Sequence, residues 1–361
     1  MSALIPSAHV MGLAPYQQGE SKITGCDEPI KLSSNESSHG PSPAAIAAFQ
    51  SCATELNRYP DGSQTALRKA IAEVHGLDAD RIICGNGSEE LILIMVRAYL
   101  NPGDEALISE QGFIMSKIHC IAQGADIVVA PETSYRVNVD ALLERVSSKT
   151  RFCTIANPNN PTGTYISGSE IRRLHAGLPD SCLLLIDNAY AEYVDDPDFE
   201  CGSALVDEAE NVVMTRTFSK IYGLSGLRIG WAYCPADIVD VAQRIRTPFN
   251  TNGPALATAT AAIQDQAFAM QVKNSNAIEL RKIHAALGSM GIEVIPSVTN
   301  FYLLKFSAET GKTGTAAAEF LQSRGIIPRP AGNGDAYLRI TVGFDHENDA
   351  VIEALRDYMS G

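Results

Sequence analysis

Short apolar runs alternate with helix-like stretches through the middle of the chain. Six apolar runs predict buried strands, at residues 81–84, 105–108, 126–129, 151–156, 182–186 and 211–215. The stretches between them predict helices, at Leu91–Leu100, Ile114–Gln123, Ala141–Val146 and Glu170–Leu178, the last beginning at a capping box of Ser167 and Glu170. Apolar strands that alternate with helices indicate an α/β fold, in which helices cover both faces of a mostly parallel sheet.

The pattern differs at the two ends of the chain. Residues 1–40 contain Pro, Gly and Ser without periodicity, which predicts an arm that packs on the small domain or a partner subunit. After residue 253 an alanine-rich helix (Leu256–Met290) is followed by a mixture of elements: strands at 292–295, 301–305 and 337–342, and helices at 315–323 and His346–Met359. We therefore expect an arm (1–40), a large domain (41–253) and a smaller α+β domain (254–361).

Composition and charge narrow the class of protein. The 361 residues are 45% hydrophobic and 19% charged, as in an ordinary globular protein. The net charge of −14 argues against an extended basic face for nucleic acid or anionic membrane. The most apolar stretch, residues 91–96, is too short to span a bilayer, and the N-terminus does not resemble a signal peptide. We expect a cytoplasmic protein.

Eight cysteines are spread along the chain, and none forms a C-x-x-C pair. Three of them, Cys84, Cys153 and Cys182, fall within predicted strands. This usage favours reduced core thiols over a disulfide framework or a zinc site, so no metal is expected.

Polar clusters follow four of the predicted strands. These are GNGSE (85–89), NPNNPTG (157–163), DNAY (187–190) and TFSK (217–220). Ligands of parallel sheets gather beyond the carboxyl ends of the strands, so the four clusters predict one shared site.

Lys220 carries the most specific chemistry, within TFSKIYGLSGLRIG (217–230). A lysine there could form a Schiff base with a carbonyl compound, while the hydroxyls of Thr217 and Ser219 and the Arg228 guanidinium could hold a phosphate. Pyridoxal phosphate (PLP) is an aldehyde that bears a phosphate, so it meets both requirements. A structural turn, with Arg228 in a surface ion pair, is the alternative.

The other candidates each have a structural alternative. The backbone amides of Gly87, Ser88 and Glu89 could bind a phosphate at a helix start, or Ser88 could simply cap that helix. The buried carboxylate of Asp187 could face a protonated ring nitrogen or cap a turn. Arg339 interrupts an apolar strand and needs an anion, which is either a substrate carboxylate or an internal acid.

Taken together, the motifs resemble fold-type I PLP-dependent aminotransferases, and specifically the histidinol-phosphate aminotransferase family. The resemblance runs nearly end to end. It rests on KLSSNE (31–36), GPSP (40–43), RYPDG (58–62), GNGSEE (85–90), ANPNNPTG (156–163), RTFSK (216–220), GLRIG (226–230), PFN (248–250) and LRITVG (338–343). It implies a seven-stranded sheet in the large domain and a homodimer with shared active sites.

The same resemblance implies roles for the matching residues. Lys220 would bind the PLP aldehyde and move the substrate proton, Asp187 would pair with the ring nitrogen, and Phe113 would stack on the ring. Tyr190 and Asn160 would contact the phenolic oxygen. The phosphate would be held by Gly87, Ser88, Glu89, Thr217, Ser219, Arg228 and, from the neighbouring subunit, Tyr59.

The substrate would be held by a second set of residues. Arg339 would bind the α-carboxylate of glutamate or 2-oxoglutarate, while Arg329 and the partner chain's Tyr16 would hold a phosphate or side-chain acid. Asn35 and Ser116 are the further substrate-binding residues. Ser116 stands where the family often has Tyr, Asn188 stands where it often has Glu, and Gly325–Asp335 is unusually rich in Pro and Gly.

The resemblance favours histidinol-phosphate:2-oxoglutarate aminotransferase. Three alternatives stay open: an aromatic amino acid aminotransferase, a threonine-phosphate decarboxylase, and a non-catalytic PLP-binding protein.

Overall fold

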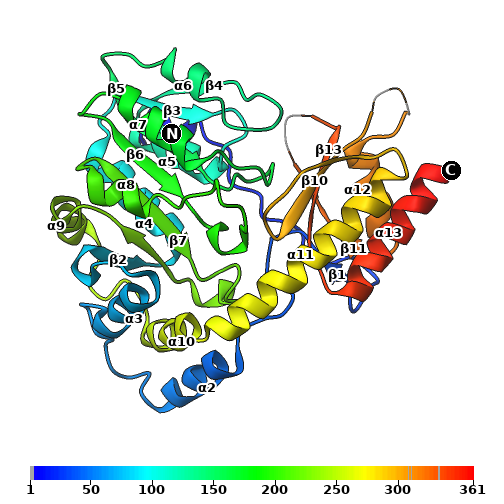
Figure 1. Ribbon diagram of the computed structural model, residues 1–361, viewed down its shortest axis with the longest axis horizontal. Coiled ribbons are helices and arrows are strands. Elements are labelled where there is room, and N and C mark those ends of the chain that lie inside the picture. Colours follow the sequence, from blue (N-terminus) through cyan, green and yellow to red (C-terminus); the bar gives the residue numbers. More distant parts are fainter. Residues whose placement is uncertain (1–3, 308, 310, 332–333) are drawn as a thin grey trace.

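The computed structural model describes residues 4–307, 309, 311–331 and 334–361, which form two lobes (Figure 1). The larger lobe is built on a seven-stranded sheet and the smaller one on a four-stranded antiparallel sheet. Helix α11 (Gln266–Gly288) runs from one lobe to the other (Figure 1). The expected α/β architecture with a smaller α+β part is confirmed.

The large sheet has the strand order β2-β8-β7-β6-β5-β3-β4. Its strands are β2 (Ile82–Gly85), β3 (Glu105–Ser109), β4 (Asp126–Ala130), β5 (Thr150–Ala156), β6 (Leu183–Asp187), β7 (Val212–Thr217) and β8 (Gly230–Tyr233). Six of them confirm the apolar runs. The pattern missed β8, which has four residues, begins with glycine and runs antiparallel to both neighbours.

Both faces of this sheet are buried. In β6, Leu184 and Ile186 face one hydrophobic cluster, whereas Leu183 and Leu185 face another, as the twofold period of a strand requires. One face is covered by α4 (Gly87–Tyr99), α5 (Ile114–Gln123) and α9 (Ala236–Ile245). The other is covered by α3 (Thr65–His75), α6 (Val139–Leu143), α7 (Gly168–Gly177), α8 (Ser203–Glu208) and α10 (Gly253–Gln264).

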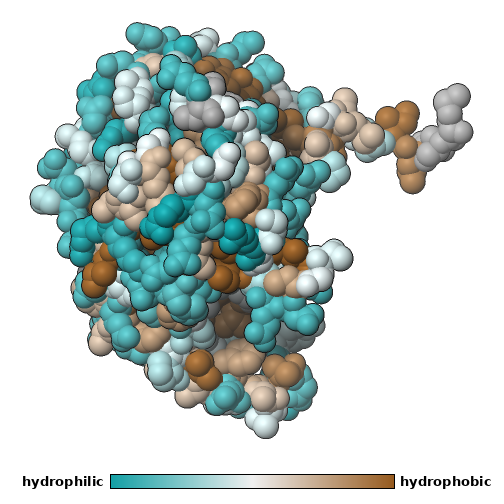
Figure 2. Space-filling view, turned by 90° about the vertical axis from the view of Figure 1, so that its right-hand side faces the viewer, coloured by the Kyte–Doolittle hydropathy of each residue, from teal (hydrophilic) through white to brown (hydrophobic). Residues whose placement is uncertain are grey.

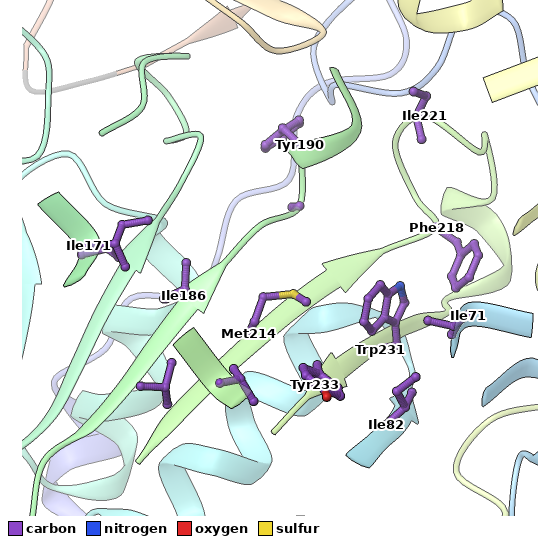
Figure 3. Close-up of a cluster of buried hydrophobic side chains, with 14 of the residues drawn as sticks. Ile71, Ile82, Ile171, Ile186, Tyr190, Met214, Phe218, Ile221, Trp231 and Tyr233 are labelled. Atoms are coloured by element: carbon purple, nitrogen blue, oxygen red, sulfur yellow. The ribbon is translucent and has the colours of Figure 1, made fainter. Parts of the chain in front are cut away.

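The core on this second face supports the strand ends. Figure 3 shows Ile186, Met214 and Trp231 projecting from three neighbouring strands among side chains of the covering helices. Tyr190 lies at the edge of this cluster, beyond the end of the strand that carries Ile186 (Figure 3). Burial of each large apolar side chain stabilises the fold by about 1.5–3 kcal/mol, so the residues just beyond these strands stand on a rigid base.

The helix predicted at Leu256–Met290 is two helices. Asp265 separates α10 from α11 and caps the second, accepting a hydrogen bond from Phe268 N at 3.2 Å. Helix α10 packs against α2 (Pro43–Ser51) and α3, and the large-lobe core includes Val272 of α11. The core of the large lobe therefore continues past residue 253, and the change of lobe occurs within α11.

The small lobe confirms its predicted elements. Its sheet has the order β12-β13-β10-β9, with β9 (Glu293–Ile295), β10 (Phe301–Lys305), β12 (Arg329–Pro330) and β13 (Tyr337–Thr341). Helices α12 (Gly314–Ser323) and α13 (Asp345–Ser360) complete its core. The Pro- and Gly-rich stretch 325–335 lies in this lobe, and its residues 332–333 fall outside the described residues.

The arm contacts both lobes of its own chain. Strand β1 (Ile30–Lys31) pairs in parallel with β11 (Ile326–Ile327) of the small lobe, and α1 (Ala8–Met11) contacts α5 of the large lobe. The N-terminal segment extends away from the body of the molecule (Figure 2), where Leu4 is 85% and Ile5 is 92% exposed. Contact with a partner subunit stays a prediction.

No helix in the described part of the chain has both the length and the apolarity to cross a membrane. Among the same residues, no group of three or more His, Cys, Asp or Glu side chains is placed to hold a metal ion. All eight cysteines are free thiols.

Candidate active site

One cavity of about 290 Å³ lies beyond the carboxyl ends of the parallel strands. The arm, the large lobe and the small lobe all contribute to its wall. Its side chains include four cations, Lys220, Arg228, Arg329 and Arg339, and three acids, Glu36, Glu89 and Asp187. A cluster of cations in a chain of net charge −14 favours an anionic ligand at this place.

Lys220 lies just past the end of β7, with its amine inside the cavity. The Nζ atom donates to Ser34 O at 3.4 Å and lies 5.7 Å from the centre of the Tyr190 ring. Burial and the nearby guanidinium of Arg339 lower the pKa of Lys220 to about 8. About a tenth of this amine is therefore neutral at pH 7, and the neutral form is both a nucleophile and a base.

Asp187 ends β6 and is only 5% exposed. Its carboxylate accepts a hydrogen bond from Thr215 Oγ1 at 3.1 Å and forms no ion pair with any described residue. Burial raises the pKa of Asp187 to about 6. A buried carboxylate with only neutral partners gains most from a cation placed beside it.

Arg339 projects from β13 towards the same cavity. It donates to Asn160 Oδ1 at 2.7 Å and to Ser33 O at 2.9 Å, while its buried Nε has no hydrogen-bond partner in the described chain. The alternative of an internal acidic partner is wrong, because both of these acceptors are neutral. The guanidinium is available to an anion in the cavity.

Tyr190 and Asn160 both line this cavity. The buried Tyr190 hydroxyl accepts a hydrogen bond from Asn35 Nδ2 at 2.9 Å, and burial raises the pKa of Tyr190 to about 12. The phenol is therefore neutral at physiological pH, so it carries a proton that it can donate. Asn160 lines the cavity from the loop after β5 and is held by Arg339.

The start of α4 forms a candidate phosphate-binding site next to Arg228. This helix begins without a side-chain cap, so amides of its first turn are open to an anion, and the alternative that Ser88 caps it is wrong. Arg228 lies against Gly87, where an added Cβ would come within 2.7 Å of the guanidinium. Arg228 also donates to Ser219 Oγ at 3.3 Å, which in turn accepts from Thr217 Oγ1 at 3.0 Å.

Phe113 and Ser116 lie at the start of α5, and both border a small second cavity. Phe113 lines the main cavity at the start of α5, whereas Ser116 is buried behind it. Ser116 borders a second cavity of about 10 Å³, the size of one water molecule, together with Asp187 and Thr154. Ser116 does not line the main cavity of this chain, and its expected contact with the substrate stays a prediction.

Arg329 and Tyr16 close the outer end of the cavity. Arg329 donates to Gln17 O at 2.8 Å, and its guanidinium lies 5.9 Å from the centre of the Tyr16 ring. Tyr16 was expected to reach a partner's site. It lines the cavity of its own chain, because the hydrogen bond from Arg329 to Gln17 O holds this part of the arm beside the cavity.

Tyr59 is a predicted site residue that lies away from the cavity. It is 83% exposed and stacks on Phe249, with the ring centres 4.7 Å apart. Its expected role in a neighbouring subunit's site stays a prediction.

Several residues of the site were missed by sequence reasoning. Ser33, Ser34 and Glu36 line the cavity around Asn35, and Thr215 supports Asp187. Ser33, Ser34 and Glu36 lie outside any strand and carried no periodic signal, whereas the period of two along YLRITV indicates which residues share a face with Arg339.

Comparison with known proteins agrees with this geometry. The family model described as aminotransferase class I and II matches residues 27–355. The chain is 48% identical over 360 residues to the histidinol-phosphate aminotransferase of Maricaulis maris, and 48% identical over 362 residues to that of Paramagnetospirillum magneticum, with 99% of each chain covered in both cases.

A solved structure is also similar over almost its whole length. The histidinol-phosphate aminotransferase from Sinorhizobium meliloti, in complex with pyridoxal-5'-phosphate, superposes with a TM-score of 0.90 at 27% identity, covering 99% of both chains. The extent of the family match and the identity to full-length relatives show that this chain belongs to the class I and II aminotransferase family.

Proposed function

We propose that this chain is a PLP-dependent aminotransferase that transfers the amino group of histidinol phosphate to 2-oxoglutarate. The single observation that carries the proposal is the cavity in which Lys220, with a lowered pKa, lies beside buried Asp187 and three arginines. The histidinol-phosphate aminotransferases at 48% identity over their full length supply the choice of substrate.

The donor set fits PLP. Lys220 would hold the aldehyde, and the unpaired carboxylate of Asp187 would match a protonated ring nitrogen. The uncapped start of α4, with Thr217, Ser219 and Arg228, would hold the phosphate. Phe113 would stack on the ring, and Tyr190 and Asn160 would donate to its phenolic oxygen.

When bound, PLP supplies a ring that carries the negative charge left at the substrate carbon after a proton is removed. The side chains of this protein would move the proton, hold the charge of the ring nitrogen and limit the access of water. The neutral Lys220 amine would remove the proton from the α-carbon and deliver it to the carbon on the other side of the substrate nitrogen, and Asp187 would keep the ring nitrogen protonated. Residues from both lobes and the arm surround the cavity and limit access of water to it.

The outer arginines would select the substrates. Arg339 would take the α-carboxylate of 2-oxoglutarate in a bidentate contact, and Arg329 with Tyr16 would take the distal acid or the phosphate of histidinol phosphate. A phenyl side chain would leave Arg329 without an anion, which disfavours the aromatic alternative.

We also propose a homodimer, in which the exposed Tyr59 reaches the partner's phosphate site. The cytoplasmic location expected from the composition belongs to the same proposal.

The substrate is tested by comparing kcat/KM for histidinol phosphate and for phenylalanine, with 2-oxoglutarate as acceptor. We expect the larger value for histidinol phosphate, and no turnover of either donor by the Lys220→Ala variant. A larger value for phenylalanine would move the assignment to the aromatic aminotransferases.

A further inference from the structure

Tyr190 has one hydroxyl proton, and the direction of this proton decides whether the residue can donate a hydrogen bond to a ligand in the cavity. The hydroxyl already accepts a hydrogen bond from Asn35 Nδ2 at 2.9 Å. Its own proton is therefore free to point into the cavity. If the Asn35 amide were turned over, its oxygen would face Tyr190 and would take this proton instead. The orientation of one amide thus controls whether Tyr190 is a donor to a ligand.

A contact from the small lobe determines that orientation. The Asn35 backbone N–H donates to Thr341 Oγ1 at 2.9 Å, which leaves the Thr341 hydroxyl proton to be donated elsewhere. The acceptor within reach is Asn35 Oδ1, at 3.4 Å. With its oxygen engaged by Thr341, the amide must present its nitrogen to Tyr190.

The backbone around Asn35 is fixed as firmly as its side chain. Asn35 has a φ of +53°, in the left-handed region that asparagine tolerates better than most residues. Asn300 Nδ2 donates to Asn35 O at 3.0 Å and to Glu36 O at 3.3 Å. Asn35, Thr341 and Asn300 are each at most 3% exposed, so water does not compete for these bonds.

The sequence of β13 explains why Thr341 lies here. Arg339 and Thr341 are two residues apart and therefore share a face of the strand, the face directed at the cavity, while Leu338 and Ile340 enter the small-lobe core. The same strand thus supplies a candidate anion ligand and, two residues on, a hydroxyl that reaches Asn35.

We propose that Thr341 is a positioning residue, whose hydroxyl holds the Asn35 amide so that Tyr190 donates its proton to the phenolic oxygen of the cofactor. The proposal rests on the proposed function, because the acceptor in the cavity belongs to PLP. It links the small lobe directly to the electronic state of the cofactor.

The test is the pH midpoint of the absorbance change of the PLP-loaded protein. The phenolic oxygen and the neighbouring Lys220 nitrogen share a proton in the loaded protein. A donor at the oxygen stabilises the form that has lost this proton, so losing the donor raises the midpoint. Loss of one hydrogen bond corresponds to a shift of about half to one pH unit.

We expect Thr341→Val to raise the midpoint by this amount and Thr341→Ser, which keeps the hydroxyl, to match the wild type. Neither substitution changes a charge around Tyr190, whose titratable neighbours are Lys220, Asp187, Arg339 and Tyr16. Thr341→Ala provides a second hydroxyl-free variant if the valine variant does not fold. The melting temperature of each variant shows whether it is folded.

A double-mutant cycle tests whether Thr341 acts through the Asn35 amide or by another route. If Thr341 acts only through the amide, Asn35→Gly, which suits a positive φ, should abolish any further effect of Thr341→Val. The proposal is overturned if the midpoint is unchanged in the folded hydroxyl-free variants, or if Thr341→Ser shifts it as much as Thr341→Val does. It is also overturned if the effects of Thr341→Val and Asn35→Gly are fully additive. A wild-type protein that binds no PLP would instead contradict the proposed function.

Discussion

Burying a charged side chain in the cavity prepares it for a ligand but lowers the free energy of unfolding of the cofactor-free protein. Asp187 is the clearest case, because burial raises the pKa of its carboxyl to about 6, above its ordinary value of 3.8. The cofactor-free folded protein then binds more protons than the unfolded chain between about pH 4 and 6, so its stability falls as the pH rises through that range. Above pH 6 the full cost, about 3 kcal/mol, remains.

We therefore expect Asp187→Asn to raise the melting temperature of the cofactor-free protein at pH 7, while tight PLP binding is lost. The amide oxygen can still accept from Thr215, so the hydrogen bond at 3.1 Å is preserved. Asp126→Asn, at an exposed position, is the matched control and should change neither property. A lower melting temperature for Asp187→Asn at pH 7 would contradict the account.

Arg329 acts at the substrate end of the cavity, and its predicted effect is selective. Removal of a charge-assisted contact to a phosphate costs about 2–3 kcal/mol, so Arg329→Ala should lower kcat/KM for histidinol phosphate by about 30- to 100-fold. The loss for phenylalanine should be only a few-fold. Arg324→Ala, which removes a surface ion pair with Asp357, is the control. Equal losses for both donors would exclude Arg329 from the phosphate site.

At the scale of elements, the half-buried carboxylate of Glu132 links two loops that follow strands of the large sheet. Glu132, just beyond β4, accepts from Ser109 Oγ at 2.6 Å, from Gln111 N at 3.2 Å and from Asn159 Nδ2 at 3.3 Å. One side chain thereby joins the loop that leads to Phe113 with the loop that carries Asn160. Burial raises the pKa of Glu132, which indicates a structural rather than a solvent-exposed acid.

Glu132→Ala should therefore weaken PLP binding by about tenfold, because two loops lose their common anchor. Glu132→Gln keeps the shape and one acceptor oxygen, so its loss should be smaller. The dissociation constant is measured by absorbance titration, with the exposed Glu110→Gln as control. Wild-type affinity in Glu132→Ala would show that the two loops are positioned without this clamp.

Which elements could be predicted from the sequence depended on how local their signal was. Six strands of the large sheet were predicted from their apolar runs: five are buried on both faces, and the partly exposed edge strand β4 keeps the run Ile-Val-Val. Strand β8 was missed because it begins with a glycine and directly follows the glycine-rich segment 223–229, and the break at Asp265 was missed because the flanking residues are equally helical.

At the scale of the whole molecule, the site depends on residues that no local pattern brings together. Asn35 and Thr341 are 306 positions apart in the chain and meet only after both lobes and the arm have formed. Motifs at strand ends could be predicted to converge, because parallel strands share one edge. The burial of Ser116 beside the main cavity and the place of Tyr16 in its own chain could not be predicted, because they depend on how helices and the arm pack.

A homodimer with shared sites makes a prediction of its own. Tyr59 is exposed and distant from its own cavity, so a Tyr59→Ala subunit should be repaired by a partner that supplies the tyrosine. Co-expression of Lys220→Ala and Tyr59→Ala subunits should recover roughly a quarter of wild-type activity, since half of the dimers are mixed and each holds one complete site. Activity equal to the average of the two homodimers would contradict a shared site.

The central claim is that Lys220 and PLP move an amino group from histidinol phosphate to 2-oxoglutarate in this cavity. Its most direct test is the absorbance spectrum of the PLP-loaded protein during the two half-reactions, recorded separately. Histidinol phosphate alone should convert the spectrum to that of the amine form of the cofactor, and 2-oxoglutarate should then restore it, with neither change in Lys220→Ala. A spectrum that histidinol phosphate leaves unchanged, or a full cycle in Lys220→Ala, would contradict the account.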